Sequence, residues 1–417
     1  MMVVESFGDN SEVIIMKNRN VLIWTATVLF SLIFIFAGNR IVSKDLKVFQ
    51  DAGAAATVKA EVLSIEDTLS NRYDMGNGSY FENLTLIFSC RILSGDQAGQ
   101  VVKGYQGFYE MTEGVADVKQ VEPGDKIVIY NYPDPDTGVE WTFGEYIRFD
   151  VILWLAAFFF LLLLFLGKFK GLNTVISLTF TCLAVFFVFI PSVLNGYNIY
   201  LTSSIVCFFT IVMTLLIVNG ASQKTLATIL GCIFGVVVAA LLSLIMDKFL
   251  ALSGLVDDQS IYLQMLNPEK PIDLKAVIFG SIIIGAMGAL MDVAMDISSS
   301  LYEITRHVEG ISFGKLFKSG MNIGSDIMGT MANTLVLAYI GSSLSSVLLL
   351  ITYATSFLEL LNREHIIVEL LQSLVGSTAV LLTIPLTTLV CCLLYTCGKP
   401  RSQDQPPIGV GPQGKEI

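Results

Sequence analysis

Long uncharged apolar runs decide what this sequence can fold into. One such run lies near the start of the chain, and others follow one another from residue 151 onward. A helix of about 20 residues rises about 30 Å, which is the thickness of the hydrocarbon core of a bilayer. Only 15% of the residues are charged, against about 25% in soluble domains. The sequence therefore excludes a single soluble core and predicts an α-helical polytopic membrane protein.

Eight membrane spans are predicted. They cover residues 21–37, 151–166, 175–194, 199–218, 226–246, 276–297, 327–353 and 373–395. Lys and Arg in short connections favour the cytoplasmic side, and with eight spans the basic connections fall on one side. The predicted order is a cytoplasmic segment (1–20), an anchor (21–37), an outward domain (38–150), seven spans (151–396) and a cytoplasmic disordered tail (397–417). Both termini are then cytoplasmic.

The polar stretch at 38–150 is predicted to be a β-rich domain on the extracytoplasmic side. Alternating runs bounded by turn residues predict strands at 58–65, 84–92, 101–108, 126–132 and 141–147. Five short strands suggest a small closed barrel of the OB or SH3 type. Two roles remain open for it. It is either a recognition module for a cell-envelope ligand or a lid or assembly domain, and nothing in it looks catalytic.

Charge and motif content exclude several classes of function. The net charge of -11 argues against a nucleic-acid partner, because phosphate binding needs the opposite sign. The two histidines, His307 and His365, are predicted to lie in separate loops, so a histidine-based metal site is not expected. No Gly-rich loop ending in Lys and Ser or Thr occurs in the sequence, so ATP hydrolysis by this chain is not expected either. The chain is not predicted to be an enzyme.

Acidic residues in span 276–297 and just beyond it form half of the candidate site. The spacing puts these side chains on one helical face, which small residues continue: Gly285, Gly288, Asp292, Asp296, Ser299 and Glu303. An Asp near mid-helix costs about 2.5 to 3.5 kcal/mol on membrane-insertion scales. This span is therefore predicted not to face lipid all round.

The following span supplies the other half. Asp326, Thr330 and Asn333 share a face, and Gly324 and Gly329 would let two backbones approach closely. The two spans are predicted to form an antiparallel hairpin whose polar faces meet in the protein interior. Three or four buried carboxylates cannot all stay ionised without shared protons or a cation. Coupling to a proton or a metal cation is therefore expected, with no other cofactor.

Two alternatives to a coupling site remain open. In the first, Asp292, Asp296 and Asp326 mark helix ends in the headgroup zone, with Asp326 near a helix N-terminus. In the second, paired aspartates form an intramembrane protease, but the Gly-Ser-Asp at 324–326 lacks the second glycine of a G-x-G-D motif. Elsewhere, Gly231 and Gly235 form a G-x-x-x-G motif, which predicts helix packing.

Three runs carry a resemblance to a known family. They are GALMDVAMDISSSLYEI (288–304), GMNIGSDIMGTMANTLVLAYIG (320–341) and NREHIIVELLQSLVGSTAVLLTIPLT (362–387). In these runs the sequence resembles the YibE/F-like family of bacterial membrane proteins, and the resemblance is taken to span most of the chain. It implies an anchor, an outward β-rich domain, a multi-span region and a bacterial cytoplasmic-membrane location. It assigns neither an activity nor catalytic residues.

The leading functional hypothesis is a secondary transporter or exporter of an ion or small solute. Its coupling residues would be Asp292, Asp296 and Asp326, with Glu303 and Asn333 on the same faces. The competing hypothesis is a non-transporting envelope scaffold or sensor, in which the outward domain binds an envelope partner and the acids are structural. The bilayer is the expected environment, and the pattern allows an oligomer. The solute, the direction of transport and the ligand of the β domain are not specified.

Overall fold

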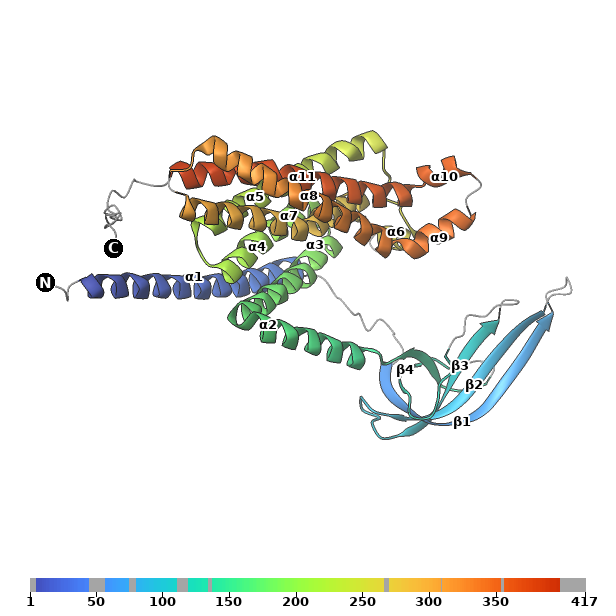
Figure 1. The fold of residues 1–417 in the computed structure, drawn as a ribbon. Coiled ribbons are helices and arrows are strands. Elements are labelled where there is room, and N and C mark those ends of the chain that lie inside the picture. Colours follow the sequence, from blue (N-terminus) through green and yellow to red (C-terminus); the bar gives the residue numbers. More distant parts are fainter. Residues whose placement is uncertain are drawn as a thin grey trace, which may run out of the picture. The chain divides into compact units, whose positions relative to one another are not determined.

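A computed structural model describes residues 5–44, 57–74, 80–110, 119–133, 137–265, 270–308, 310–353 and 356–397. The predicted tail therefore lies almost wholly outside the described residues. The chain divides into two compact units, one formed by residues 47–162 and one by residues 1–46 together with 163–417. Figure 1 shows a β domain and a helical bundle. The two units are described separately.

The β domain is a closed five-stranded barrel. Its strands are β1 (Thr57–Asp74), β2 (Tyr80–Ile92), β3 (Val101–Glu110), β4 (Lys126–Asn131) and β5 (Trp141–Tyr146). They are hydrogen-bonded in the order β1-β2-β3-β5-β4, and β4 closes back on β1. The pairs are antiparallel except for β3 with β5. Phe88, Ile127 and Ile129 are fully buried inside it. The predicted small barrel is confirmed.

The segment that leads into β4 is fastened to the barrel by side-chain hydrogen bonds. The buried Gln106 accepts a hydrogen bond from the backbone N–H of Val121 (2.9 Å) and donates one to the carbonyl of Lys119 (3.2 Å). Tyr146 donates its hydroxyl proton to the same carbonyl (2.7 Å). Lys119 in turn donates to both carboxylate oxygens of Asp125 (2.8 and 2.9 Å). The segment is therefore held by β3, β5 and its own ion pair.

Acid is expected to destabilise the barrel through Asp125. Partial burial opposes ionisation of this carboxyl, but hydrogen bonds from Lys119 and the Glu122 N–H outweigh it, so the pKa of Asp125 is lowered. A lowered pKa stabilises the folded barrel above the ordinary value of 3.8, and this contribution is lost as the pH falls through the folded-state pKa. Unfolding followed by circular dichroism from pH 5 to pH 2 should show this loss. In Asp125→Asn, the stability of the barrel should depend less on pH in this range. An unchanged pH dependence would contradict the role given to Asp125.

The second unit is a bundle of long helices. The helical elements of the chain are α1 (Glu5–Val42), α2 (Phe149–Ala184), a π-helical turn η1 (Val185–Phe189), α3 (Ile190–Leu194), α4 (Ile199–Asn219), α5 (Gln223–Leu250), α6 (Asp258–Met265), α7 (Leu274–His307), α8 (Phe313–Ser342), α9 (Leu344–Tyr353), α10 (Phe357–Asn362) and α11 (Glu364–Cys397). In the described residues, six helical stretches are long and apolar enough to cross a membrane. A seventh is added if α8 and α9, bent by 61°, form one span. The count of eight stays a prediction.

The difference in span count arises at the stretch Phe149–Leu194. Its 46 residues would extend about 69 Å as one helix, more than twice the hydrocarbon thickness. The backbone at Lys168 leaves the helical region, with φ 49° and ψ −127°. This break falls between the predicted spans 151–166 and 175–194. Two apolar segments therefore flank Lys168, as the sequence pattern predicted.

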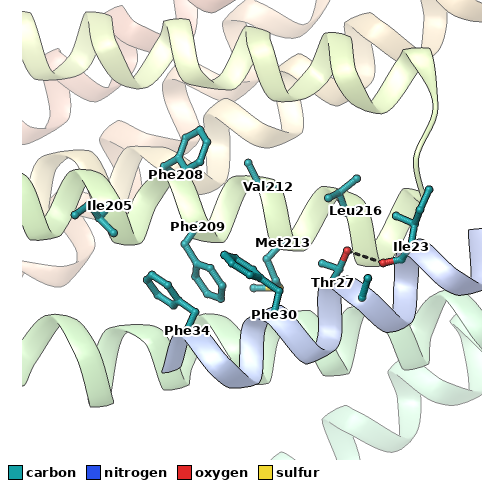
Figure 2. Close-up of a pocket in the computed structure, with 11 residues that line it drawn as sticks. Ile23, Thr27, Phe30, Phe34, Ile205, Phe208, Phe209, Val212, Met213 and Leu216 are labelled. Atoms are coloured by element: carbon teal, nitrogen blue, oxygen red, sulfur yellow. Dashed lines mark hydrogen bonds between the residues drawn. The ribbon is translucent and has the colours of Figure 1, made fainter. Parts of the chain in front are cut away.

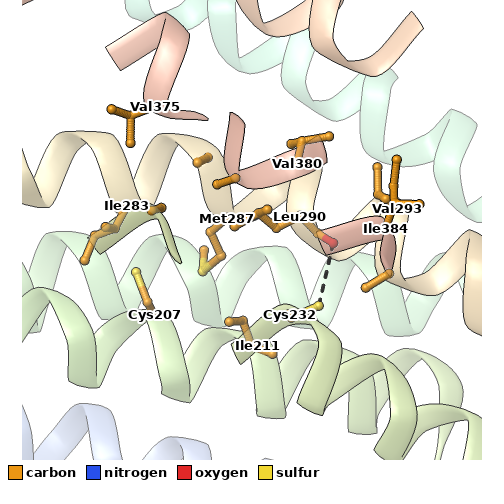
Figure 3. Packing of buried hydrophobic residues seen from close by; sticks show 14 of the residues in the cluster. Cys207, Ile211, Cys232, Ile283, Met287, Leu290, Val293, Val375, Val380 and Ile384 are labelled. Carbon is orange, nitrogen blue, oxygen red and sulfur yellow. Dashed lines mark hydrogen bonds between the residues drawn. The ribbon is translucent and has the colours of Figure 1, made fainter. Parts of the chain in front are cut away.

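Helix α11 packs against three other long helices of the bundle, α5, α7 and α8 (Figure 1). Figure 3 shows Leu290 and Val293 of α7 close to Val380 and Ile384 of α11. All four side chains are buried in one continuous apolar cluster. The buried apolar stripe of α7 thus faces the inside of the bundle. The opposite side of α7 therefore faces away from it.

Two pairs of glycines form grooves that receive α11 from two different helices. On α5, Gly231 lies against Thr387 and Gly235 against Thr383. A Cβ at either of these glycines would collide with the α11 side chain that it faces. The predicted packing role of the G-x-x-x-G motif on α5 is therefore confirmed.

The second groove lies on α8 and has the same spacing. Gly320 lies against Thr388 of α11, and Gly324 lies against Ile384. Both glycines are buried. Residues of α11 that are adjacent in sequence, Thr387 and Thr388, thus enter grooves on two different helices. Such small-residue contacts are a usual way for membrane helices to approach closely.

Glu364 at the start of α11 is hydrogen-bonded to the loop that follows α5. Its carboxylate accepts hydrogen bonds from the backbone N–H groups of Ser253 (2.8 Å) and Gly254 (2.6 Å) and from the Ser253 hydroxyl (2.7 Å). Glu364→Ala is expected to lower the free energy of unfolding by about 1.5 to 3 kcal/mol, because bonds to a charged acceptor are lost. Amide hydrogen exchange at Ser253 and Gly254 should speed up. Glu145→Ala, which removes an exposed ion pair with Arg148, is the control and should change stability by less than about 1 kcal/mol.

Candidate functional site

The acidic face of α7 lies on the surface of the bundle. Asp292, Asp296 and Glu303 are all exposed, and Gly285 and Gly288 are exposed on the same face. The predicted common face is therefore present. Asp292 lies about 27 Å from the start of α7 and about 22 Å from its end, at 1.5 Å per residue. It is a mid-helix residue.

The polar face of α8 is also exposed. Asp326, Gly329 and Asn333 lie on it, whereas Leu316, Gly320 and Gly324 are buried on the other side. Helix α8 begins at Phe313, so Asp326 lies about 20 Å into the helix. The alternative that placed Asp326 near a helix N-terminus is therefore wrong, because the helix starts well before the predicted span does.

The prediction that these acids are enclosed in the interior of the chain is wrong. Asp292, Asp296, Glu303 and Asp326 are all exposed, because α8 turns its glycine groove and apolar side toward α11. Among the residues that the structure describes, no three His, Cys, Asp or Glu side chains come together closely enough to hold a metal ion. A metal site shared by these acids is thus not formed within one chain.

The glycines predicted to bring α7 and α8 together have different surroundings. Gly324 packs on α11 rather than on α7. At Gly285, the Tyr339 hydroxyl of α8 lies 2.6 Å from the point that a Cβ would occupy, so this glycine does admit a side chain from α8. Among the residues that the structure describes, none outside the same helix turn has an atom within 4 Å of a Cβ at Gly288 or Gly329. These two glycines are therefore open on the surface of the chain.

The charges of this surface are largely unpaired. In the described parts of the chain, Asp292, Asp296 and Asp326 have no basic group within 4 Å, and neither Lys315 nor Lys318 at the start of α8 has an acidic one. Glu303 does have a partner, because one of its oxygens lies 2.9 Å from Nε2 of His307 one turn later. We call the exposed residues Gly285, Gly288, Asp292, Asp296 and Glu303 of α7 with Lys315, Lys318, Asp326, Gly329 and Asn333 of α8 the α7–α8 polar face.

One polar site was missed by the sequence reasoning. Asp247 of α5 and Lys275 of α7 lie 3.8 Å apart beside a small cavity that Tyr200 and Ser243 also line. The buried Oδ1 of Asp247 has no hydrogen-bond partner among the described atoms. Asp247 and Lys275 each fall one residue outside a predicted span, at 226–246 and 276–297. Charges are expected at span ends in any case, so no local pattern signals that these two pair.

An open apolar groove of about 370 Å³ lies between α1 and α4. Figure 2 shows Phe30 and Phe34 of α1 near Phe209 and Met213 of α4. Thr27, which also lines it, donates its hydroxyl proton to the carbonyl of Ile23 within α1 (2.8 Å). The groove thus offers hydrocarbon contacts, which suit a lipid chain better than a polar solute.

Comparison with known proteins places the multi-span region. A sequence profile of the YibE/F-like protein family matches residues 155–397, which include all three runs that carry the resemblance. The match does not include the anchor or the barrel, so it is narrower than the sequence reasoning expected. No curated protein and no solved structure matches the chain. Because the family profile covers more than half of the sequence, the chain belongs to the YibE/F-like family.

Proposed function

We propose that this protein is a secondary transporter or exporter of an ion or small solute, and that the α7–α8 polar face lines its path. The observation that carries the proposal is the position of Asp292 and Asp326. Both are mid-helix, exposed and without a basic partner in the described chain. Carboxylates in such positions mark proton relays and ion pathways in membrane proteins.

The energetics of the bilayer support this assignment. Each carboxylate facing lipid near the middle of a span would cost about 2.5 to 3.5 kcal/mol. Asp292, Asp296 and Asp326 together would therefore oppose insertion by several kcal/mol if lipid covered them. Water, a proton, a cation or another protein surface removes this penalty. A water-filled path meets the requirement and also provides a route for a solute.

The proposed topology has eight spans, both termini in the cytoplasm and the barrel outside the bacterial cytoplasmic membrane. It rests on the positive-inside distribution of Lys and Arg and on the break at Lys168, which separates two apolar segments. Cysteine substitutions read by a membrane-impermeant maleimide test it. Tyr132→Cys in the barrel should be labelled from outside intact cells and Lys170→Cys only after lysis. The reverse result would contradict the topology.

Flux through proteoliposomes tests the transport proposal. With a pH-sensitive dye inside and Na⁺, K⁺ or Mg²⁺ offered outside in turn, we expect at least one of these ions to drive a pH change. Asp292→Asn, Asp296→Asn and Asp326→Asn should each lower the rate at least tenfold, because the neutral amide neither carries a proton nor balances a cation. Glu145→Gln in the barrel is the matched control and should keep the full rate. A pH change no faster than in empty liposomes, or equal rates in all variants, would refute the proposal for these ions.

The competing function is an envelope scaffold or sensor that works through the barrel. The observation that favours it is that the barrel is a compact unit with its own buried core. We propose an OB-like barrel, because one parallel pair interrupts an otherwise antiparallel five-stranded closure. If the protein is a scaffold or sensor, cells that carry a chain without residues 57–147 should behave like cells that lack the whole protein. If it is a transporter, the same deletion should leave flux in proteoliposomes intact.

A further inference from the structure

We propose that the α7–α8 polar face is where a second copy of this chain docks, with α7 of each copy against α8 of the other. The inference rests on the membrane-spanning character of the bundle, not on transport. It goes beyond the proposed function because two chains together, and not one chain alone, would form the path. The depth, the charge and the shape of the face each support it.

Depth along the two helices follows from the turn that joins them. Helix α7 ends at His307 and α8 begins at Phe313, and the two run in opposite directions (Figure 1). A residue of α7 and a residue of α8 that are equally far from this turn along the chain lie at the same depth, because both helices rise 1.5 Å per residue. Glu303 is then level with the region of Lys315 and Lys318. Copies related by a two-fold axis along the membrane normal share these depths, so the match also holds between two chains.

Close to the turn, charges at matched depth are complementary. Glu303 lies four residues before the end of α7, and Lys315 and Lys318 lie two and five residues after the start of α8. Asp296 lies about 9 Å farther from the turn than Lys318, at 1.5 Å per residue. These lysines have no acidic partner within 4 Å among the described residues. A two-fold interface is self-complementary, so each such contact occurs twice. A second copy thus offers Lys315 and Lys318 an acidic partner, Glu303, which they lack among the described residues of one chain.

The shape of the face also suits a helix from another chain. On the same bundle, Gly231, Gly235, Gly320 and Gly324 each receive a side chain of α11. A Cβ added at Gly288 or Gly329 would instead have no described atom outside its own helix turn within 4 Å. These two glycines lie at similar depth, since Gly288 is 19 residues before the end of α7 and Gly329 is 16 residues after the start of α8. Opposed across a two-fold axis, they would let α7 and the partner copy's α8 approach closely.

Lipid is a poor occupant of this face, because acyl chains offer no partner to Asp292, Asp296, Asp326 or the lysines. The contact also fits the proposed path. With α7 of one copy against α8 of the other, Asp292 and Asp296 of the first chain and Asp326 of the second would line one lumen. The lumen would then be incomplete in a single chain.

Disulfide trapping between two differently tagged chains tests the docking. One chain carries Gly288→Cys and the other Gly329→Cys, co-expressed in the membrane and oxidised with copper phenanthroline. We expect a mixed-tag cross-linked product at least fivefold above that of chains with only the natural cysteines. Phe234→Cys paired with Leu382→Cys, two exposed positions on α5 and α11, is the matched control for random collision. A yield no greater than this control, or a dominant Gly288→Cys homodimer, would overturn the inference.

Charge exchange gives a second, independent measurement in purified proteoliposomes. Lys315→Glu with Lys318→Glu should reduce the dimer fraction, counted by single-molecule photobleaching, at least fivefold. Mixing this chain with one carrying Asp296→Lys and Glu303→Lys should restore a mixed dimer, whereas Lys170→Glu should have no effect. Failure of the restoration would overturn the α7-to-α8 pairing. A dimer without flux would refute the proposed function alone, and flux from a chain that stays monomeric would refute the docking alone.

Discussion

Replacing Gly324 by leucine is expected to lower the free energy of unfolding of the bundle by about 3 kcal/mol, the upper end of the usual range for overpacking. The reason is that the side chain of Ile384 fills the space in which the new Cβ would lie. Helix α8 would have to move away from α11, which would also pull Gly320 from Thr388. Thermal unfolding in detergent should show a fall in Tm of several degrees. Cross-links between α8 and α11 should form less readily.

The matched control is Gly341→Leu on the same helix. A Cβ at Gly341 meets no atom from elsewhere in the described part of the chain within 4 Å, so the larger side chain should change stability by less than about 0.5 kcal/mol. The comparison separates the loss of the groove from the effect of removing a glycine. Equal losses at both positions would show that the packing of α8 on α11 is not what stabilises this part of the bundle.

Phe88→Ala is expected to destabilise the barrel by about 3 to 5 kcal/mol, because it removes a fully buried aromatic ring and leaves a cavity. The ring also supports β3, since it lies 2.7 Å from the point that a Cβ on Gly104 would occupy. Amide protection of β2 and β3, measured by hydrogen exchange on the full chain, should fall by at least a hundredfold. Protection in the helical bundle should not change, because the barrel is a separate compact unit.

Tyr132→Ala provides the control for the barrel, because this side chain is 66% exposed. It should alter the exchange of β2 and β3 by less than threefold. If Phe88→Ala left the protection of the barrel unchanged, its core could not be the cluster around Phe88, Ile127 and Ile129.

The barrel was predictable because alternation of side chains is a local signal. The five predicted strands are confirmed, and their boundaries agree within two residues except at two places: β1 runs to Asp74 rather than ending at residue 65, and β2 begins at Tyr80 rather than at residue 84. The distal half of β1 is polar and pairs with β2 alone, for example Leu69 with Thr85. Residues such as Ser70 and Asn71 give no hydrophobic pattern there. Only pairing with the neighbouring strand reveals the extension.

The candidate site was predictable in part. Spacing in the sequence correctly grouped Asp292 with Asp296 and Asp326 with Asn333, because the helical period fixes which residues share a face. It could not say what each face contacts. Helix α8 carries polar and small residues on more than one side, and the side with Gly320 and Gly324 is the one that α11 covers. The choice between these sides depends on the shape of α11, which no local pattern encodes.

Helix α11 packs on three helices that precede it in the chain, which has a consequence for biogenesis. Helices α5, α7 and α8 precede α11 in the chain, so the ribosome delivers them to the translocon first. The glycine grooves of α5 and α8 then have no α11 side chain to receive until α11 itself is inserted. Any event that stops synthesis before residue 364, or slows the release of α11, would leave three inserted helices without their common neighbour. Quality-control proteases of the membrane would meet that intermediate, and its lifetime would set the yield of the mature protein.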